Sequence, residues 1–374
     1  MSRLTRYLNR LYLVRFAVVL LAVAGFALLF DLLDVGAKVV RRSGGSSWAL
    51  VSYALIRLPT LLTELLPMVA LLAGLLTAAD LLRFRELVAM WSAGLSRLGL
   101  AVRLWPAALL IVAGKLVLDD VAVPATIPTL RALGVADVKT VGLPTGDAIW
   151  LTTDGAVLRL PAEAAVQGEP RDLLILRLDP EGRLVERLEA ARAEPGPEGW
   201  ILHEVVRRPA SAAPSERLDT LLLPMRIDLE TVALMAKLPR ELSIAQLLRV
   251  IGADGYGIGG TESHRTWLHA RLAGAVGLWA LIVVPVLLVR RAERTGTTLA
   301  IFTRGLAIGF AYLIGNGLML AMGELGLAPP AVAAWTVPFL LAAGALSGGG
   351  LLEPRRGRPV AAPPPPSATL RTAP

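Results

Sequence analysis

The sequence predicts an α-helical membrane protein with six transmembrane helices and an all-β domain inserted between the third and the fourth. Hydrophobic residues make up 55% of the 374 residues, and the mean hydropathy is +0.60. Such a chain is too apolar for an ordinary soluble domain. Between the third and the fourth apolar segments, about 139–227, the pattern changes to short alternating strands separated by turn residues.

Six apolar segments are long enough for the roughly 20 helical residues that cross a hydrocarbon core of about 30 Å. The third segment is interrupted by Arg103 and Lys115. The first is not expected to be a cleaved signal peptide, because Asp31 and Asp34 follow it without a small-residue cleavage site. The six predicted spans are 16–33, 58–79, 98–118, 272–289, 299–322 and 325–352.

Basic residues near the span ends predict that both termini lie in the cytoplasm. With the N-terminus inside, the arginine-rich ends at 3–15, 83–103, 290–304 and 355–371 are all cytoplasmic. The long insertion is then exported, and the proline-rich tail 354–374 is expected to be disordered in the cytoplasm. The net charge of +8 therefore reflects membrane topology and anionic lipid, and no nucleic-acid partner is expected.

The exported segment reads as a series of β-strands. Ala148–Leu160 is expected to be a hairpin that turns at Asp154 and Gly155, and 172–194 holds two strands around a second turn. The pattern favours a β-sandwich or an open barrel. A helix over 242–255, with Ser243 as its N-cap, is expected to lead back to the membrane. The predicted divisions are 1–123 for spans one to three, 124–240 for the β domain and 241–353 for the linker helix and spans four to six.

Several kinds of chemistry are not expected of this chain. It has no cysteine and only three histidines, which argues against disulfides, thiolate catalysis and a cysteine or histidine metal site. No phosphate-binding loop of the Walker type is present. Ser347 lies in a glycine-rich run, but no histidine lies on a neighbouring span to activate it. We expect neither enzymatic activity nor a cofactor on the chain, so the energy for any work comes from elsewhere.

The turn between the second and third spans, "RFRELVAMWSAGLSRLG" (83–99), is unusually organised. On a helix over 83–98, its apolar residues fall on one face and its small and polar residues on the other. Gly94 can end or bend this helix. The helix is expected to lie at the cytoplasmic interface, where its small-residue face could dock a soluble partner. The alternative is an ordinary interfacial helix that holds the span ends.

This turn resembles the cytoplasmic motif of the LptF/LptG family of lipopolysaccharide-export permeases. The resemblance covers most of the chain, including "LTELLPMVALLAGLL" (62–76), the "LSIAQLL" helix and "WLHARLAG" (267–274). The family often has a proline after that last motif, where this chain has Ala275. "DDVAVP" (119–124) resembles the LptG branch more than the LptF branch.

The resemblance implies a permease subunit of an ABC transporter in the bacterial inner membrane. Such a subunit forms a heterodimer with its paralogue and binds two copies of a cytoplasmic ATPase. Its other partners are a single-span LptC-type subunit and a periplasmic bridge protein, and its substrate is lipopolysaccharide. The exported domain would be a β-jelly roll. The turn would be the coupling helix, and its ATPase contacts would be Arg85, Glu86, Leu87, Val88, Ala93 and Gly94. Pairing of Glu86 with Arg83 is the structural alternative.

Charged residues collect near the outer ends of the spans. An ionisable group at midplane costs about 2.5–3.5 kcal/mol, so such groups tend to be paired or to line a cavity. Lys115 is expected to pair with Glu64 or Asp31. Under the resemblance this collar faces the phosphates of lipopolysaccharide, and the alternative is a set of solvated interface charges. The substrate-contact residues put forward are Asp31, Lys38, Arg41, Glu64, Arg131 and Arg271.

Two further questions stay open at the level of the sequence. The small residues Gly305 and Gly309 fit either a lateral gate or a fixed packing seam. Two other kinds of protein also compete with the permease. An ABC mechanotransmission protein of the FtsX or MacB kind has four spans and its exported domain after the first span. A non-transport inner-membrane scaffold would use the β domain to bind envelope partners.

Overall fold

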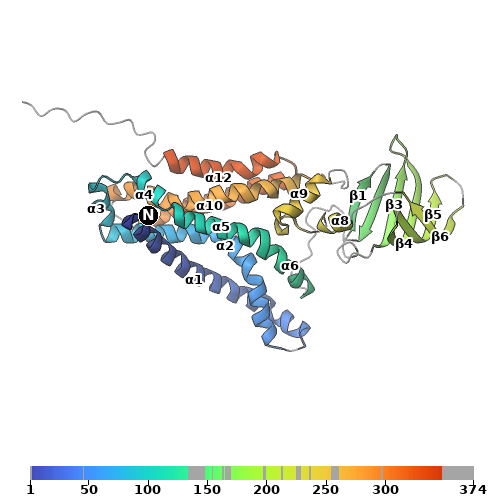
Figure 1. The fold of residues 1–374 in the computed structure, drawn as a ribbon, viewed down its shortest axis with the longest axis horizontal. Helices are drawn as coiled ribbons and strands as arrows, with labels where there is room; N and C mark the ends of the chain where they lie inside the picture. Colours follow the sequence, from blue (N-terminus) through green and yellow to red (C-terminus); the bar gives the residue numbers. More distant parts are fainter. Residues whose placement is uncertain are drawn as a thin grey trace, which may run out of the picture.

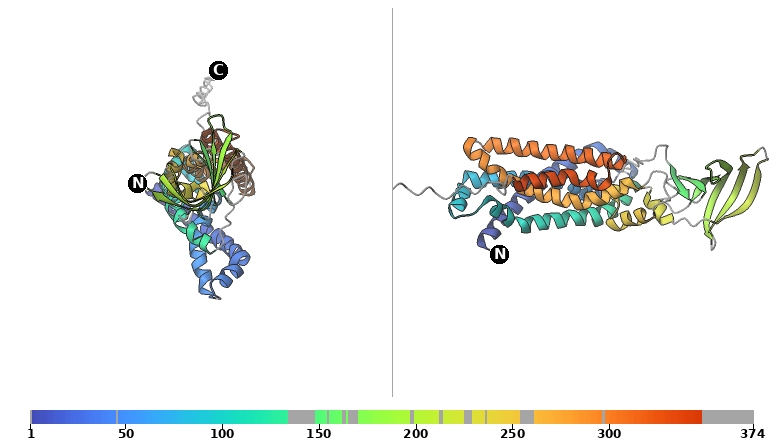
Figure 2. Two further views of the ribbon diagram at one scale, coloured as in Figure 1. Left: turned by 90° about the vertical axis from the view of Figure 1, so that its right-hand side faces the viewer. Right: turned by 90° about the horizontal axis from the view of Figure 1, so that it is seen from above.

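The computed structural model is elongated, with a bundle of long helices at one end and a β-sheet at the other (Figure 1). Figure 2 shows that the sheet stands beyond the end of the bundle rather than along its side. The N-terminus lies at the far end of the bundle, beside α3 (Glu86–Ser92) and α4 (Arg97–Arg103). The residues that the structure describes are 2–44, 46–133, 148–153, 155–161, 164, 170–196, 199–211, 214–224, 229–235, 237–253, 261–295 and 298–347.

Among the described residues, four helices are long and apolar enough to cross a membrane. They are α1 (Arg3–Arg42), α2 (Trp48–Arg83) and parts of α10 (Glu262–Thr295) and α11 (Thr298–Glu324). A further apolar helix, α12 (Pro330–Leu346), has 17 residues. These helices fall where spans one, two, four, five and six were predicted. The last begins at Pro330 rather than at 325, because a proline is well suited to the first turn of a helix.

The third predicted span is not one continuous helix. A new helix starts at Trp105, and Pro106 in its first turn has no N–H to donate to the preceding turn. The N–H of Ala107 donates to the side-chain oxygen of Asn9, at 2.7 Å. Farther along, five residues form a π-helix, a wider turn that often occurs at functional sites. The pieces that follow α4 are α5 (Trp105–Val117), η1 (Leu118–Ala122) and α6 (Val123–Ala132).

Helix α6 extends the bundle beyond the predicted boundary at 123. Its residues Ile127 and Leu130 are buried against Val39 of α1 and Tyr53 of α2. Residues 124–132 were expected to open the exported β domain, whereas they are helical and pack on the spans. Their apolar side chains repeat at helical spacing, which explains this outcome.

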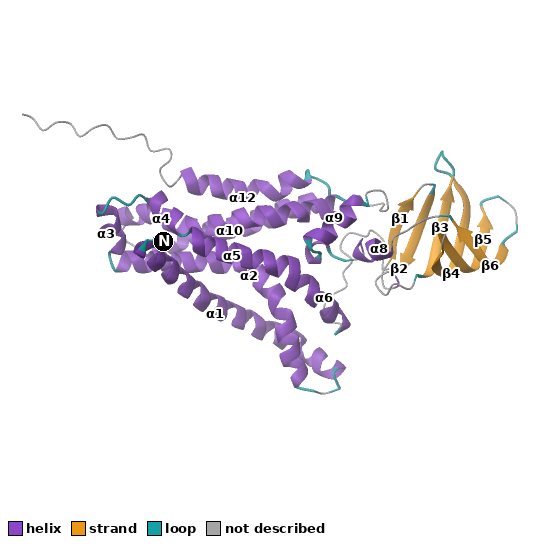
Figure 3. Ribbon diagram, in the orientation of Figure 1, coloured by secondary structure: helices purple, strands orange, loops and turns teal. Residues whose placement is uncertain are grey.

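Six strands form a single antiparallel sheet in which neighbours in sequence are neighbours in space (Figure 3). This confirms a β domain inserted between the third and fourth spans. The sequential order is a meander, and the described strands lack the crossover connection that a jelly roll requires. The strands are β1 (Ala148–Thr153), β2 (Ala156–Pro161), β3 (Arg171–Leu178), β4 (Leu184–Gly196), β5 (Gly199–Pro209) and β6 (Glu216–Leu223).

The two predicted turns connect paired strands. Thr153 pairs with Ala156 across the first, where Gly155 has a φ of 73°. In the second turn, the Asp179 carboxylate accepts the N–H of Arg183 at 2.7 Å, and Gly182 has a φ of 80°. Hydrogen bonding from this N–H lowers the pKa of Asp179 below its usual value, so the carboxylate is ionised and accepts this bond at neutral pH.

Three short helices connect the sheet to the bundle. They are α8 (Leu229–Met235), the 3₁₀ helix η2 (Pro239–Glu241) and α9 (Ile244–Gly252). Ser243 caps α9, as predicted, and it also forms a capping box with Gln246. The apolar face of α9 packs on the start of α10, so the segment that follows the sheet is joined to a long apolar helix through a packed contact.

Small residues form the seam between α2 and α11. A Cβ on Gly309 would overlap Leu71 of α2, and one on Gly305 would overlap Leu75. Both leucines are fully buried. The two glycines therefore lie in a packing seam inside this chain, and this contact supports the packing seam rather than the lateral gate.

We expect Gly309→Val to destabilise the bundle by about 1–3 kcal/mol, because the added methyl groups cannot fit beside Leu71. Gly317→Val is the matched control, since nothing lies within 4 Å of a Cβ at that exposed position of the same helix. The measurement is the midpoint of thermal unfolding in detergent. Equal midpoints for the two variants would show that the seam is not tightly packed.

Candidate functional site

The α3 turn joins α2 to α4 at the end of the bundle farthest from the sheet (Figure 1). Arg85 has a left-handed backbone with a φ of 56°, and it separates α3 from α2. Gly94 has a φ of 83° and ends α3 in the way a C-terminal glycine commonly does. The predicted helix over 83–98 is therefore shortened to the seven residues of α3, with a turn before α4.

The faces of α3 differ from the expected pattern. Leu87 and Met90 point into the core of the bundle, where they are 1% and 9% exposed. Phe84 and Val88 were expected on the same apolar face as Leu87, yet both are exposed. Arg85, Ala93 and Gly94 are exposed as well. Of the six expected ATPase contacts, four therefore lie on the surface, Glu86 is half-buried, and Leu87 anchors the helix.

Glu86 is held by α1. The Tyr7 hydroxyl donates to this carboxylate, at 3.0 Å from Oε1 and 2.8 Å from Oε2. The alternative partner, Arg83, lies instead over the ring of Phe84, 5.8 Å from its centroid. Tyr7 was not singled out from the sequence, because it is 79 residues away from Glu86 and nothing local marks the pair.

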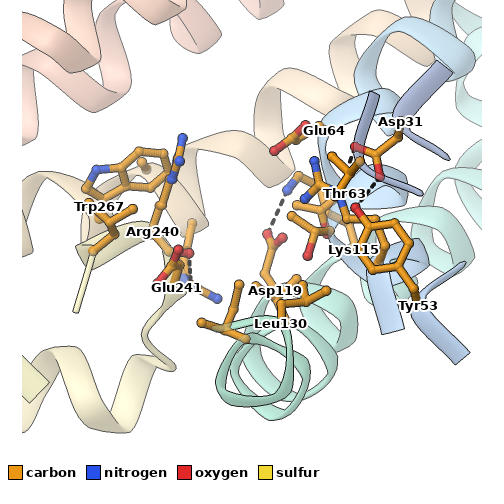
Figure 4. A pocket seen from close by; sticks show the side chains of 18 of the residues that line it. Asp31, Tyr53, Thr63, Glu64, Lys115, Asp119, Leu130, Arg240, Glu241 and Trp267 are labelled. Atoms are coloured by element: carbon orange, nitrogen blue, oxygen red, sulfur yellow. Dashed lines mark hydrogen bonds and ion pairs between the residues drawn. The ribbon is translucent and has the colours of Figure 1, made fainter. Parts of the chain in front are cut away.

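Three of the six predicted substrate contacts, Asp31, Glu64 and Arg271, line a cavity at the opposite end of the bundle, on the side of the β domain. Figure 4 shows the side chains that line it. Its volume is about 460 Å³. Residues from α1, α2, α5, η1, α6, η2 and α10 line it. We call it the outer pocket, and its charged lining residues are Asp31, Asp34, Arg57, Glu64, Lys115, Asp119, Arg240, Glu241 and Arg271.

Most of the cations in the outer pocket are neutralised by nearby carboxylates. Lys115 pairs with Asp119 at 2.6 Å, not with Glu64 or Asp31 as predicted. The two residues are four apart, where α5 passes into the π-helix, and this brings them together on one side of the chain. Asp31 accepts a hydrogen bond of 2.5 Å from Tyr53, and its other oxygen lies 3.4 Å from Arg57.

Some of the other charges in the outer pocket have no such partner among the described residues. Glu64 and Arg240 are exposed and line the pocket, and no ion pair joins either to another described residue. Figure 4 shows Arg240 on the side of Trp267 and Glu64 on the side of Lys115. Lys38 and Arg41, both predicted to contact substrate, are exposed on α1 outside this lining. Arg131 lies in α6, and its side chain is outside the described residues.

Arg271 is part of the pocket wall and is only 6% exposed. Its guanidinium donates to the carbonyl oxygens of Leu242 and Arg240, the latter at 3.2 Å. Nη1 also lies 4.0 Å from the carboxylate of Asp120, in the π-helix. The same carboxylate accepts the N–H of Ile244, at the start of α9, at 2.5 Å. We call this arrangement the Asp120 clamp, because it joins the third span, the linker helix and the fourth span.

The outer pocket can hold a polar group by charge and hydrogen bonding, but its described residues do not form a metal site. No group of three histidine, aspartate or glutamate side chains gathers as ligands in the described part of the chain. Sequence patterns did not reveal Tyr53 and Arg240 as pocket residues. Their spacing along the chain carries no motif, and only packing of α2 and η2 against the other spans brings them together.

A comparison with protein-family models matches residues 6–348 to the family described as lipopolysaccharide export system permease LptF/LptG. The match includes the α3 turn, the outer pocket, the sheet and all the described spans. Among curated proteins, no match was found.

Proposed function

The chain belongs to the LptF/LptG family of lipopolysaccharide export permeases, and from this we propose that it is a transmembrane subunit of an ABC transporter. The transporter extracts lipopolysaccharide from the inner membrane and passes it through the exported β domain to a periplasmic bridge. The chain itself hydrolyses no ATP and carries no cofactor. We assign it to the LptG role because of the "DDVAVP" run at 119–124.

The observation that carries this proposal is the position of the α3 turn. It lies at the end of the bundle opposite the sheet, so an ATPase docked there would be separated from the exported domain by the length of the spans (Figure 1). The turn exposes Val88, Ala93 and Gly94, while Leu87 fixes it to the core. A rigidly anchored turn with an exposed apolar surface suits the transmission of movement from an ATPase to the spans.

The outer pocket lies where a lipid headgroup would enter the path to the β domain. We propose that Glu64, Arg240 and the pocket side of Arg271 face the headgroup of lipopolysaccharide. The carboxylate of Asp31 already accepts a hydrogen bond from Tyr53 and pairs with Arg57. We therefore assign Asp31 to the pocket wall and not to the headgroup contacts. Lys38, Arg41 and Arg131 remain proposed substrate contacts on the outer surface of α1 and on α6.

The proposal implies a defined set of partners and an orientation in the membrane. The chain pairs with its paralogue, and the pair binds two copies of a cytoplasmic ATPase, an LptC-type subunit and a periplasmic bridge protein. Both termini and the α3 turn lie in the cytoplasm, and the sheet lies in the periplasm. The arginines at the start of α1 and around the α3 turn support this orientation.

Co-purification of the tagged full chain from detergent-solubilised membranes tests the proposed function. We expect the eluate to contain the paralogous subunit, ATPase activity and bound lipopolysaccharide. The scaffold remains the second candidate, since a β-sheet that stands clear of the bundle also suits the binding of envelope partners. An eluate with periplasmic proteins but with neither ATPase nor lipopolysaccharide would favour the scaffold and contradict the permease.

A further inference from the structure

A groove runs between α1 and α5 at the end of the bundle that carries the α3 turn. Its volume is about 670 Å³, and it is lined by the first turns of α1 and by the start of α5. It is separate from both sites described above, because it shares no lining residue with the outer pocket and none with the α3 turn. We call it the α1–α5 groove.

Hydrogen bonds of a buried asparagine fix the floor of this groove. Asn9 is 6% exposed, and its amide nitrogen donates to the carbonyl oxygens of Thr5 and Arg103, each at 2.7 Å. Its side-chain oxygen accepts the N–H of Ala107 at 2.7 Å. Asn9 thus fixes α1 to the break between α4 and α5. Because its hydrogen-bonding groups are all engaged, the floor offers little to water.

Beyond Asn9, the groove is lined by apolar side chains. Leu13, Val14 and Ala17 continue along the same side of α1, and Leu110 faces them from α5. Val14 and Leu110 are 50% and 60% exposed. An exposed apolar channel beside two spanning helices is suited to a flexible acyl chain.

The mouth of the groove carries two arginines. Arg6 and Arg10 are one helical turn apart, both are exposed, and both line the groove. Neither guanidinium has an ion pair or hydrogen bond within the described part of the chain. Nearby arginines do have partners: Arg15 is paired with Asp80, and Arg103 donates to the Gly99 carbonyl. No acidic residue is among the described residues that line the groove.

We propose that the α1–α5 groove binds one anionic phospholipid from the leaflet on the α3 side of the membrane. The phosphate lies between the guanidinium groups of Arg6 and Arg10, which present donors in the planar geometry that suits phosphate oxygens. One acyl chain follows Leu13, Val14 and Leu110 toward the middle of the bilayer. Basic pockets between spanning helices bind anionic headgroups in this way. The lipid would be a bound structural component and not the exported substrate.

The two arginines and the apolar channel of the groove together favour an anionic phospholipid as the occupant. A free phosphate ion would satisfy the arginines but would leave the apolar channel empty. A helix of a partner subunit would fill the channel but would bury two unpaired positive charges, which is costly. An anionic phospholipid satisfies both parts, and the bilayer supplies it at high local concentration.

Lipid binding to the purified full chain tests this proposal, with native mass spectrometry as the readout and phosphatidylglycerol and phosphatidylcholine as probes. We expect Arg6→Gln/Arg10→Gln to weaken phosphatidylglycerol binding roughly tenfold or more. The control is Arg83→Gln/Arg304→Gln, which removes the same charge from two exposed positions at the same end of the bundle but outside the groove. It should bind phosphatidylglycerol like the wild type.

A second variant, Ala17→Phe, tests the channel without changing charge. We expect it to reduce phosphatidylglycerol binding as well, while the midpoint of thermal unfolding confirms that each variant is folded. Equal losses in the two arginine pairs would overturn the proposal, because they would indicate a diffuse surface charge. Undiminished binding by a folded Ala17→Phe variant would overturn it too. So would cross-linking of the groove to a helix of the paired subunit in the intact complex.

Discussion

The substitution Glu86→Lys is expected to remove the ATPase from the purified complex, with at least a tenfold loss of ATP-driven lipopolysaccharide release. Glu86 is the half-buried carboxylate at the start of α3, and it borders the exposed surface formed by Val88, Ala93 and Gly94. A lysine there reverses the charge offered to the ATPase. The measurements are ATPase activity in the eluate and lipopolysaccharide release from proteoliposomes.

Tyr7→Phe tests whether Glu86 contacts the ATPase or only positions α3. This variant removes the hydroxyl that donates to Glu86 at 2.8 Å but leaves the carboxylate in place. If Glu86 contacts the ATPase, Tyr7→Phe should retain most of the bound ATPase. A loss as large as that in Glu86→Lys would mean that the carboxylate serves to position α3 through α1. Full retention of the ATPase by Glu86→Lys would contradict the coupling role altogether.

The substitution Asp120→Ala is expected to cause the second large effect, by opening the Asp120 clamp. It removes the acceptor for the first N–H of α9, at 2.5 Å, and the nearest carboxylate to the buried Arg271. Leaving the N–H of Ile244 without its acceptor costs about 1–3 kcal/mol. Arg271 loses a carboxylate 4.0 Å away but keeps its two carbonyl acceptors. The Asp120 side chain is 37% exposed, so solvent reduces the ionic part of this loss.

Thermal unfolding and limited proteolysis of the link between the bundle and the sheet measure this effect. Asp120→Asn keeps an oxygen acceptor for Ile244 and removes only the charge, so we expect a stability between those of the wild type and Asp120→Ala. Asp34→Ala is the matched control, because Asp34 is an exposed carboxylate of the same outer pocket with no described ion pair. Equal stability of the Asp34→Ala and Asp120→Ala variants would show that the Asp120 clamp does not stabilise the fold.

Much of this fold could be predicted, because it depends on patterns that are local in the sequence. Long apolar runs define α1, α2, α10 and α11, and alternating residues with Asp-Gly or Glu-Gly turns define the strands. The capping box at Ser243 is also local, since its two partners are three residues apart. Features of this kind need no knowledge of what packs against them.

Most of the missed features depend on packing between distant segments or on unusual backbone. The left-handed conformation of Arg85 shortens α3, and nothing about an arginine signals it. Lys115 pairs with Asp119 at the ordinary i, i+4 helical spacing, so this missed pair was local in the sequence and the expected pair with Glu64 overlooked it. Tyr7 with Glu86 and Asn9 with Ala107 are contacts between separate helices, and neither partner marks the other in the sequence.

The central claim, that this chain is the membrane subunit of an ATP-driven lipopolysaccharide exporter, is tested most directly by reconstitution. The chain, its paired subunit and the ATPase would be placed in proteoliposomes that contain lipopolysaccharide, and release to a soluble periplasmic acceptor would be followed by cross-linking. We predict release that requires ATP and is lost with Glu86→Lys. Steady ATP hydrolysis without any release of lipopolysaccharide from the wild-type complex would contradict the account.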